Sequence, residues 1–315
     1  MNKLIVSSSP HIRTKNETPR VMLDVIIALL PTAAAGAYIF GIRALLVIAT
    51  CVLSAVIGEF VFNLIVKKEQ TIFDLSAVVT GLILALNLRA DAPIWQCVIG
   101  SVFAIIVVKC LFGGLGCNFA NPAIAGRIFL LICFTSTLGG GARPLVSSAP
   151  ELVSGATPLE IMKGGDVAGL PSLLDMFLGF RGGAIGECCI AAILIGFIYL
   201  VVRKVIHFET PLIFVATVFA LSLIVDNSFT MALYQVLAGG LVFGAVFMAT
   251  DYVTTPITRT GKMIFAFGCG LITFLIRYFG NYPEGVSFSI LLMNILSPYI
   301  EKWTAPKALG GKKAK

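Results

Sequence analysis

The sequence predicts an all-helical protein that crosses a membrane many times. Apolar residues make up 58% of the 315-residue chain and charged residues only 12%, against about 45–50% and 25% in a soluble globular protein. The mean hydropathy is +0.97, and glycine and phenylalanine are abundant, as expected where helices pack closely in lipid. Because so few charges cannot cover a soluble globule of this size, the polytopic membrane class follows.

Apolar runs long enough to form membrane-spanning helices follow one another along the chain. A span needs about 20 residues to cross a ~30 Å hydrocarbon layer, and ten candidates are found, some of them short. They cover residues 22–40, 43–66, 75–88, 93–112, 121–138, 184–203, 211–226, 230–250, 262–279 and 286–303.

The basic residues predict the orientation, because cationic loops stay on the cytoplasmic side. With the N-terminus inside, sixteen Lys and Arg residues fall on inner segments, six fall on outer segments and Arg127 lies within a run. Residues 1–21 and 304–315 are therefore predicted to be cytoplasmic tails. The net charge of +7 reflects this placement, and no nucleic acid partner is expected. The eight cysteines have no CxxC spacing, so no metal site is expected.

A long loop divides the ten runs into two sets of five. Residues 139–183 are rich in Gly, Pro and Ser and fall on the outer side in this topology. Structureless loops of this length are usually functional or disordered. The predicted organisation is a first five-helix repeat at 22–138, the outer loop at 139–183 and a second five-helix repeat at 184–303.

The two halves have related sequences. Residues 109–131 and 277–298 each show an FG start, a Gly/Pro-rich break and an apolar helix, and residues 78–88 resemble 237–247. An odd number of spans per half makes such repeats inverted across the membrane, as in urea channels. In inverted-repeat proteins the binding sites lie at the repeat interface, often beside broken helices.

Residues 154–159 (SGATPL) are the most distinctive pattern of the outer loop. Ser-Gly favours a turn, and Thr157 is followed by Pro158 at the first helical position and Glu160 at the third, as in a capping box. An anion beside Thr157 would also meet the unpaired amides of that helix start. The pattern therefore fits both a helix cap and a phosphate site.

Six segments, in this order, together resemble one family. They are residues 9–12 (SPHI), 73–88 (FDLSAVVTGLILALNL), 116–127 (GCNFANPAIAGR), 154–159 (SGATPL), 249–256 (ATDYVTTP) and 284–294 (EGVSFSILLMN). They resemble the D subunits of Rnf complexes, which are ferredoxin:NAD⁺ oxidoreductases. These are similar to the B subunits of sodium-pumping NADH:quinone reductases, which typically carry a longer N-terminal region than this chain.

The resemblance implies that Thr157 carries FMN through a phosphoester bond, within a flavinylation sequence that includes Ser154, Gly155 and Ala156. That sequence usually has Asp six residues before the acceptor, and Glu151 stands here instead. The implied protein is a redox subunit that turns over no substrate alone. It relays electrons within a complex that couples electron transfer between ferredoxin and NAD to Na⁺ or H⁺ translocation. The implied partners are the other subunits, a flavin transferase and the lipid of the bacterial cytoplasmic (inner) membrane.

Residues 118–123 (NFANPA) are a second candidate site. Asn118 and Asn121 at the start of a span, with Pro122, favour a broken helix whose backbone lines a cavity. The resemblance suggests a second flavin there, such as noncovalent riboflavin. A structural break at the repeat interface is the alternative.

Ionisable side chains within spans are costly and are therefore functional candidates. Glu59, Glu187 and Asp226 are the candidates for an ion path, although hydrogen bonding between helices explains Glu59 and Glu187 equally well. Arg127 fits either the negative charge of a flavin or a carboxylate partner. Lys109 lies near a predicted boundary, where its side chain can reach the headgroups.

A second function remains compatible with the inverted repeats. A small-solute channel or transporter would need a continuous polar pore, no flavin, and SGAT acting only as a helix cap. Fold alone does not separate the two functions, so Thr157 is the residue that discriminates between them.

Overall fold

A computed structural model of the chain describes residues 18–138, 141–142, 154–164, 169–282 and 284–306. The first half contains α1 (Thr18–Phe40), α2 (Ile42–Val66), η1 (Ile72–Asp74), α3 (Ser76–Leu86), α4 (Ile94–Val102), η2 (Phe103–Cys110) and α5 (Pro122–Cys133). Then follow α6 (Thr135–Leu138), β1 (Gly141–Ala142), β2 (Ser154–Gly155), α7 (Pro158–Lys163) and α8 (Leu173–Leu178). The second half contains α9 (Ile190–Val202), α10 (Glu209–Asp226), α11 (Phe229–Leu237), α12 (Leu241–Phe243), η4 (Gly244–Met248), α13 (Arg259–Phe279) and α14 (Val286–Thr304).

The helices confirm the all-helical, polytopic membrane class. Among the described residues, α1, α2, α10 and α13 are each long and apolar enough to cross a membrane. A fifth span results if α11 and the following helix are counted as one span bent by 62°. Shorter apolar helices, including α3, α5 and α9, coincide with other predicted runs. The number of ten spans stays a prediction.

The predicted continuous run 230–250 is wrong in one respect, because the helix breaks in its middle. α11 ends at Leu237 and α12 begins at Leu241, and Gly239 between them adopts a φ of +65°, which glycine tolerates without strain. Arg277 donates to the Ala238 carbonyl at 3.2 Å, and the Gly240 amide donates to Glu284 at 2.6 Å. A break inside a membrane protein is tolerated where other groups satisfy the freed backbone in this way.

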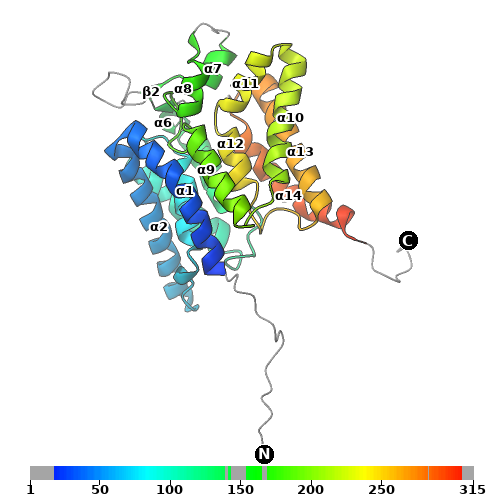
Figure 1. Cartoon of the computed structure of the whole chain (residues 1–315). Helices are drawn as coiled ribbons and strands as arrows, with labels where there is room; N and C mark the ends of the chain where they lie inside the picture. The colour runs from blue at the N-terminus through cyan, green and yellow to red at the C-terminus, as the bar shows by residue number, and fades with distance from the viewer. Residues whose placement is uncertain (1–17, 139–140, 143–153, 165–168, 283, 307–315) are drawn as a thin grey trace, which may run out of the picture.

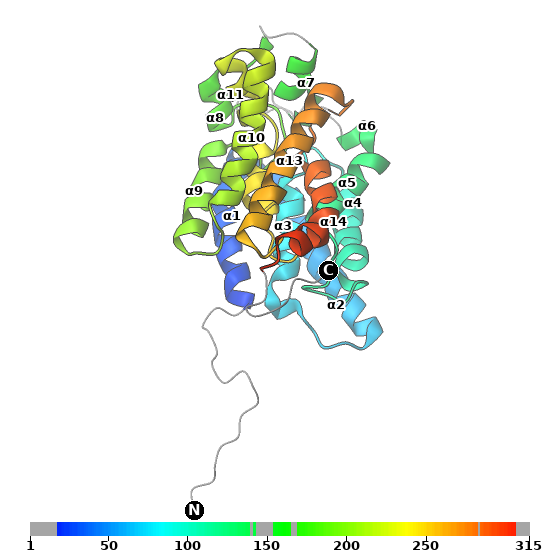
Figure 2. The ribbon, with the colours of Figure 1, turned by 90° about the vertical axis from the view of Figure 1, so that its right-hand side faces the viewer.

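Corresponding helices of the two halves make corresponding contacts. α2 packs against α3 and α4, and α10 packs against α11 and α13. α5 packs against η2 as α14 packs against α13, and the halves meet through the pairs α1–α9 and α5–α14. Figure 1 shows α1 and α2 on one side of the bundle and α10 and α13 on the other, and Figure 2 shows α14 beside α5. This pattern supports a repeat of the two halves, and the inverted arrangement of the repeats stays a prediction.

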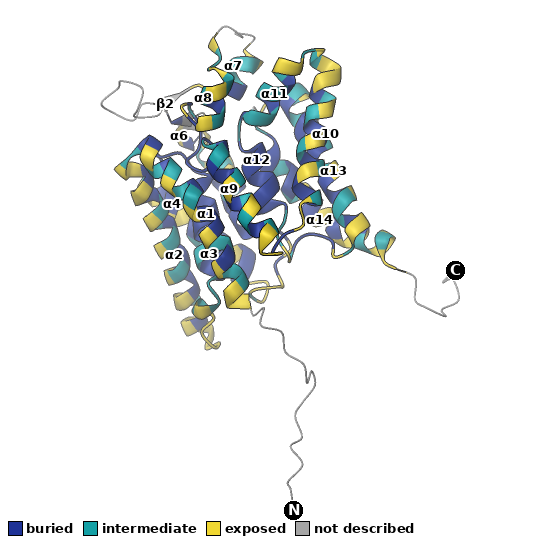
Figure 3. Cartoon of the chain, in the orientation of Figure 1, coloured by how far each residue is buried: buried dark blue, intermediate teal, exposed yellow. Residues whose placement is uncertain are grey.

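The outward faces of the helices are apolar. Leu53, Ile57 and Leu64 of α2 are each at least 58% exposed, and exposed residues lie along the outside of the bundle (Figure 3). An apolar outer surface of this extent marks a surface that meets lipid or protein. α7 and the start of α1 lie at opposite ends of the bundle (Figure 1), so a chain that spans the membrane places them on opposite sides.

Replacement of Gly196 by alanine is expected to destabilise the bundle. A Cβ on Gly196 of α9 would collide with the Ala28 carbonyl oxygen of α1 and lie 3.0 Å from the Phe247 ring. Overpacking of this kind costs about 1–3 kcal/mol. Gly58→Ala is the matched control, because the nearest atom to a Cβ there is Val102 Cγ2 at 4.0 Å. We expect only Gly196→Ala to lower the midpoint of thermal unfolding in detergent, and equal effects of the two variants would contradict this packing.

Candidate functional site

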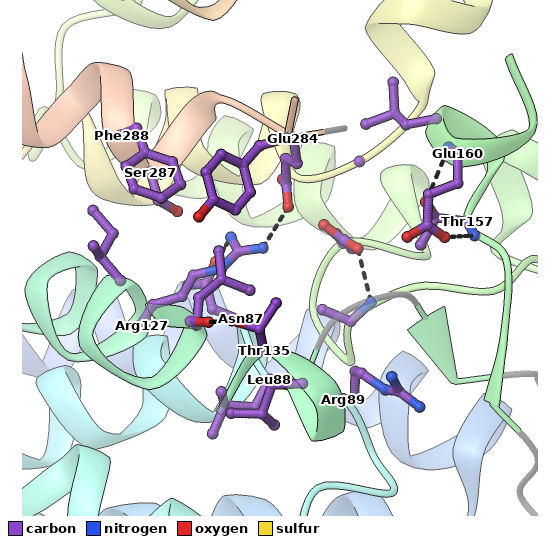
Figure 4. A pocket seen from close by; sticks show the side chains of 18 of the residues that line it. Asn87, Leu88, Arg89, Arg127, Thr135, Thr157, Glu160, Glu284, Ser287 and Phe288 are labelled. Atoms are coloured by element: carbon purple, nitrogen blue, oxygen red, sulfur yellow. Dashed lines mark hydrogen bonds and ion pairs between the residues drawn. The ribbon is translucent and has the colours of Figure 1, made fainter. Parts of the chain in front are cut away.

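A cavity of about 320 Å³ lies at the α7 end of the bundle (Figure 4). We call it the α7 cavity. It is lined by residues of α5, α6, α7 and α14, of the α3–α4 connection and the α11–α12 break, and of the segments before α9 and α14. The lining residues used below are Asn87, Arg89, Arg127, Thr157, Leu159, Glu160, Ala184, Glu187, Gly239 and Glu284. Three residues predicted separately from the sequence, Thr157, Arg127 and Glu187, therefore lie around one space.

Thr157 forms the predicted capping box at the start of α7. The Thr157 amide donates to Glu160 Oε2 at 2.6 Å, and the Glu160 amide donates to Thr157 Oγ1 at 3.3 Å. Pro158 follows at the first helical position. The expectation that an anion would meet unpaired amides here is wrong for these two groups, since the cap already satisfies both. An anion on Thr157 therefore needs a cation from elsewhere.

Apolar packing and a lysine fix α7 against the second half. Leu159 is buried and forms a small cluster with Met176 of α8 and Ala238 at the helix break. Lys163 at the end of α7 donates to the Gly280 carbonyl and, at 3.3 Å, to the Tyr282 carbonyl. These contacts hold the Thr157 end of α7 at the rim of the cavity.

The backbone of the SGAT segment is paired as well. Ser154 and Gly155 form β2, which pairs antiparallel with Gly141–Ala142 of β1. Ala142 also exchanges two backbone hydrogen bonds with Gly183, at 3.3 and 3.2 Å. This ladder ties the chain just before Ala156 and Thr157 to the segment that carries Glu187.

Arg127 of α5 is one of two arginines that line the α7 cavity. It donates to Asn87 Oδ1 at 2.7 Å and forms an ion pair with Glu284. The side chains of Arg127 and Glu284 are 14% and 19% exposed, so the pair is largely shielded from water. Of the two roles left open for Arg127, the structure shows the carboxylate partner.

Glu284 is held ionised by its surroundings. Burial alone would raise the pKa of Glu284, but Arg127, the Gly240 amide and Arg277 together hold it below the ordinary value. Sequence reasoning did not single out Glu284, Asn87 or Arg277. A signal existed for Glu284, since it lies in the segment 277–298 that repeats the Arg127 segment 109–131.

Glu187 lies in the segment before α9 and is 8% exposed. Its Oε1 accepts from the Ala184 amide at 2.8 Å, and Arg181 donates to its backbone carbonyl at 2.6 Å. Its Oε2 has no hydrogen-bond partner among the described residues. Glu187 is therefore buried with one carboxyl oxygen unbound, unlike a loop carboxylate that water solvates.

Asn118 and Asn121 line a second, smaller cavity of about 90 Å³ together with Lys109 and Asp251. Asn121 caps α5 by accepting from the Ala123 amide at 3.0 Å, and Asn118 donates to the Ala120 carbonyl at 3.0 Å. Both hydrogen bonds are local to this segment, and a second flavin beside it stays a prediction. Burial raises the pKa of Asp251, while Thr254 and the Val253 amide act in the opposite direction.

Glu59 is closed into an ion pair with Lys109. Lys109 Nζ lies 2.9 and 3.0 Å from the two Glu59 oxygens and 2.6 Å from Ser76 Oγ. Thr71 donates to Glu59 Oε1 at 2.6 Å, and the paired side chains are only 2–3% exposed. The expectation that Lys109 reaches the headgroups is wrong, because its ammonium is bound to Glu59.

Asp226 lies at the end of α10, away from these groups, and accepts a hydrogen bond from Tyr278 of α13. Among the described residues no contact joins it to Glu59 or Glu187. The three ion-path candidates thus do not form one cluster. Residues 1–17, which include segment 9–12, lie outside the described residues, as do Glu151 and residues 307–315.

Comparison with known proteins gives a consistent result along the whole chain. Residues 5–310 match the NQR2, RnfD, RnfE family. The chain is 47% identical to the D subunit of the Na⁺-translocating ferredoxin:NAD⁺ oxidoreductase complex of Acetobacterium woodii, over 99% of this chain and 97% of that protein. It is 40% identical to the D subunit of the proton-translocating ferredoxin:NAD⁺ oxidoreductase complex of Clostridium ljungdahlii, over 99% and 98%. It is 39% identical to the D subunit of an ion-translocating oxidoreductase complex of Stutzerimonas stutzeri, over 94% and 93%.

Proposed function

Because the chain belongs to the NQR2, RnfD, RnfE family, we propose that it is the electron-relaying membrane subunit of an Rnf-type complex and carries FMN on Thr157. The full-length relatives make it a subunit of an ion-translocating ferredoxin:NAD⁺ oxidoreductase complex, in preference to a solute channel. It contributes to an oxidoreductase and is not catalytic alone. FMN bound at Thr157 would supply the electron-transfer chemistry, while the protein sets its position and potential.

One observation carries the FMN proposal, namely that Thr157 and Arg127 line the same cavity. A phosphoester on the Thr157 oxygen adds negative charge, and the cavity lining includes two arginines, Arg127 and Arg89. These pair with Glu284 and Asp91, so a phosphate would share them with those carboxylates. Its volume of about 320 Å³ falls within the ~300–1,000 Å³ range of small-molecule sites. The cavity volume and the two arginines in its lining support an attached flavin phosphate.

The volume of the second cavity does not support riboflavin between Asn118 and Asn121. That cavity measures about 90 Å³, well below the ~300 Å³ at which small-molecule sites begin. Riboflavin at this position therefore has no support from the cavity, and we place only the FMN.

The orientation follows from the basic residues. We place the start of α1 on the cytoplasmic side of the bacterial inner membrane, and with it both termini. The α7 cavity then opens toward the outside, because α7 and the start of α1 lie at opposite ends of the bundle (Figure 1). A flavin transferase on that side must modify Thr157 before the subunit works with its partner subunits.

The similarity does not choose the transported ion. The relative with 47% identity is named for Na⁺ and the relative with 40% identity for protons. We therefore propose Na⁺ or H⁺ translocation by the whole complex and assign no ion to this chain.

Replacement of Thr157 by alanine is expected to abolish covalent flavin. The chain is coexpressed with a flavin transferase, denatured, and inspected for flavin fluorescence in the gel. We expect a fluorescent band in the wild type and none in Thr157→Ala, because the variant lacks the hydroxyl that forms the phosphoester.

Loss of the helix cap is a separate effect of Thr157→Ala and costs about 0.5–2 kcal/mol. Ser172→Ala controls for it, since Ser172 caps α8 through the Asp175 amide in the same way. This control should stay fluorescent. If the wild-type chain shows no flavin fluorescence while a control protein is flavinylated, Thr157 acts only as a helix cap.

A further inference from the structure

The unpartnered oxygen of Glu187 requires an explanation. Glu187 is 8% exposed, its Oε2 has no hydrogen-bond partner among the described residues, and it lines the α7 cavity. A buried carboxylate oxygen without a donor is costly when the group is ionised. A protonated Glu187 would carry a donor of its own on Oε2, and that donor needs an acceptor nearby.

Gly240 brings a second carboxylate to that oxygen. A Cβ on Gly240 would lie 2.7 Å from Glu284 Oε1, 3.0 Å from Glu187 Oε2 and 3.7 Å from Arg127 Nη1, so both carboxyl oxygens and the guanidinium lie near one point beside the α11–α12 break. Glu284 Oε1 is fixed there by the Gly240 amide at 2.6 Å. A Cβ on residue 240 would collide with Glu284 Oε1, so glycine leaves the space that this carboxyl group occupies.

The charged groups around this point are bound elsewhere and leave Glu187 Oε2 without a donor. From α5, Arg127 binds Asn87 and Glu284, and from α13, Arg277 binds the Gln235 and Ala238 carbonyls. Arg181 binds the Glu187 backbone carbonyl. At the cavity wall, Arg89 pairs with Asp91 and Glu160 binds the Thr157 amide. Cys188 follows Glu187 in its own segment and is directed to the Arg181 and Ala184 carbonyls.

We propose that Glu187 and Glu284 share one proton, which Glu187 Oε2 carries and donates to Glu284 Oε1. Two neighbouring carboxylates cannot both ionise easily, and the better stabilised one keeps the charge. Glu284 has Arg127 and the Gly240 amide, so Glu284 is the carboxylate and Glu187 the acid. This arrangement satisfies the free oxygen of Glu187 without any additional group.

The shared proton gives the α7 cavity an acid beside Glu284. This inference deepens the proposed function in one respect: a group attached to Thr157 would have a protonated carboxyl in the same cavity, able to balance a change in its charge. The existence of the proton itself depends only on Glu187, Glu284 and their neighbours.

Infrared spectroscopy of the purified chain tests the shared proton. The Thr157→Ala background is used, so the outcome is independent of whether Thr157 carries a flavin. We expect an absorption band of a protonated carboxylic acid at neutral pH that disappears in Glu187→Gln. Glu209→Gln is the control and should keep the band, since Glu209 pairs with Arg259 outside the cavity.

Glu284→Gln separates a shared proton from an isolated buried acid. Without Glu284, the like charge is gone and Arg127 is released toward Glu187, so Glu187 should ionise and its titration should shift down by about 1 pH unit or more. An isolated acid would keep its band. The proposal is overturned by the absence of the band at neutral pH, by its persistence in Glu187→Gln, or by an unchanged titration in Glu284→Gln.

Discussion

Replacement of Lys109 by methionine is expected to destabilise the protein by about 3–5 kcal/mol, because it leaves the Glu59 carboxylate buried without a cation. The Glu59 and Lys109 side chains are 2% and 3% exposed, and Lys109 supplies the charge to both Glu59 oxygens. The measurement is the midpoint of thermal unfolding of the purified chain in detergent. An unchanged midpoint would contradict a buried, closed ion pair.

The double variant Glu59→Gln, Lys109→Met decides whether this pair is only structural. Replacing a buried ion pair with neutral groups is often harmless. The glutamine that replaces Glu59 can still accept from Thr71, which donates to Glu59 at 2.6 Å in the wild type. We expect most of the stability to return. If the assembled complex with this variant also translocates its ion, Glu59 is excluded from the ion path. A stable complex that no longer translocates would assign Glu59 to the path.

Replacement of Arg127 by methionine is expected to cost about 3 kcal/mol, at the lower end of the range for breaking a buried pair. The lower end of that range applies because the Arg127 and Glu284 side chains are 14% and 19% exposed. Arg127 bridges α5 to α3 through Asn87 and to the α13–α14 connection through Glu284, so its removal loosens the cavity itself. Thermal unfolding in detergent measures the effect.

Two further substitutions define the role of Arg127. Arg127→Lys keeps the charge but loses the two-pronged geometry of the guanidinium, so an intermediate loss of stability is expected. Arg259→Ala is the control, since that side chain is 76% exposed in its pair with Glu209 and exposed pairs contribute little. Equal effects of Arg127→Met and Arg259→Ala would contradict the structural role of the Arg127 pair.

The helices that the sequence predicted best are those bounded by charged or turn-forming residues. The runs 22–40, 43–66, 262–279 and 286–303 agree with α1, α2, α13 and α14 to within four residues at either end. Apolar length alone is a sufficient signal there. The run 230–250 was predicted as unbroken because an apolar run does not show which distant side chains can bind the backbone groups at a break. Here those side chains are Arg277 and Glu284.

In the site as well, the sequence predicted a contact between near neighbours but not a contact between residues far apart in the chain. The cap formed by Thr157 and Glu160 was predicted because its two residues are three positions apart. Arg127 and Glu284 are 157 positions apart, and nothing in the spacing indicates that they meet. Arg127 and Glu187 were singled out as costly charges within spans, but only the fold brings them to the cavity of Thr157.

The most direct measurement for the FMN proposal is mass spectrometry of the chain after coexpression with a flavin transferase. The peptide that contains residues 154–163 is isolated and fragmented. We predict an FMN-derived mass on Thr157 and on no other residue of the peptide. An unmodified Thr157 in a preparation whose control protein is flavinylated, or an FMN on another residue such as Ser154, would contradict the proposed attachment site.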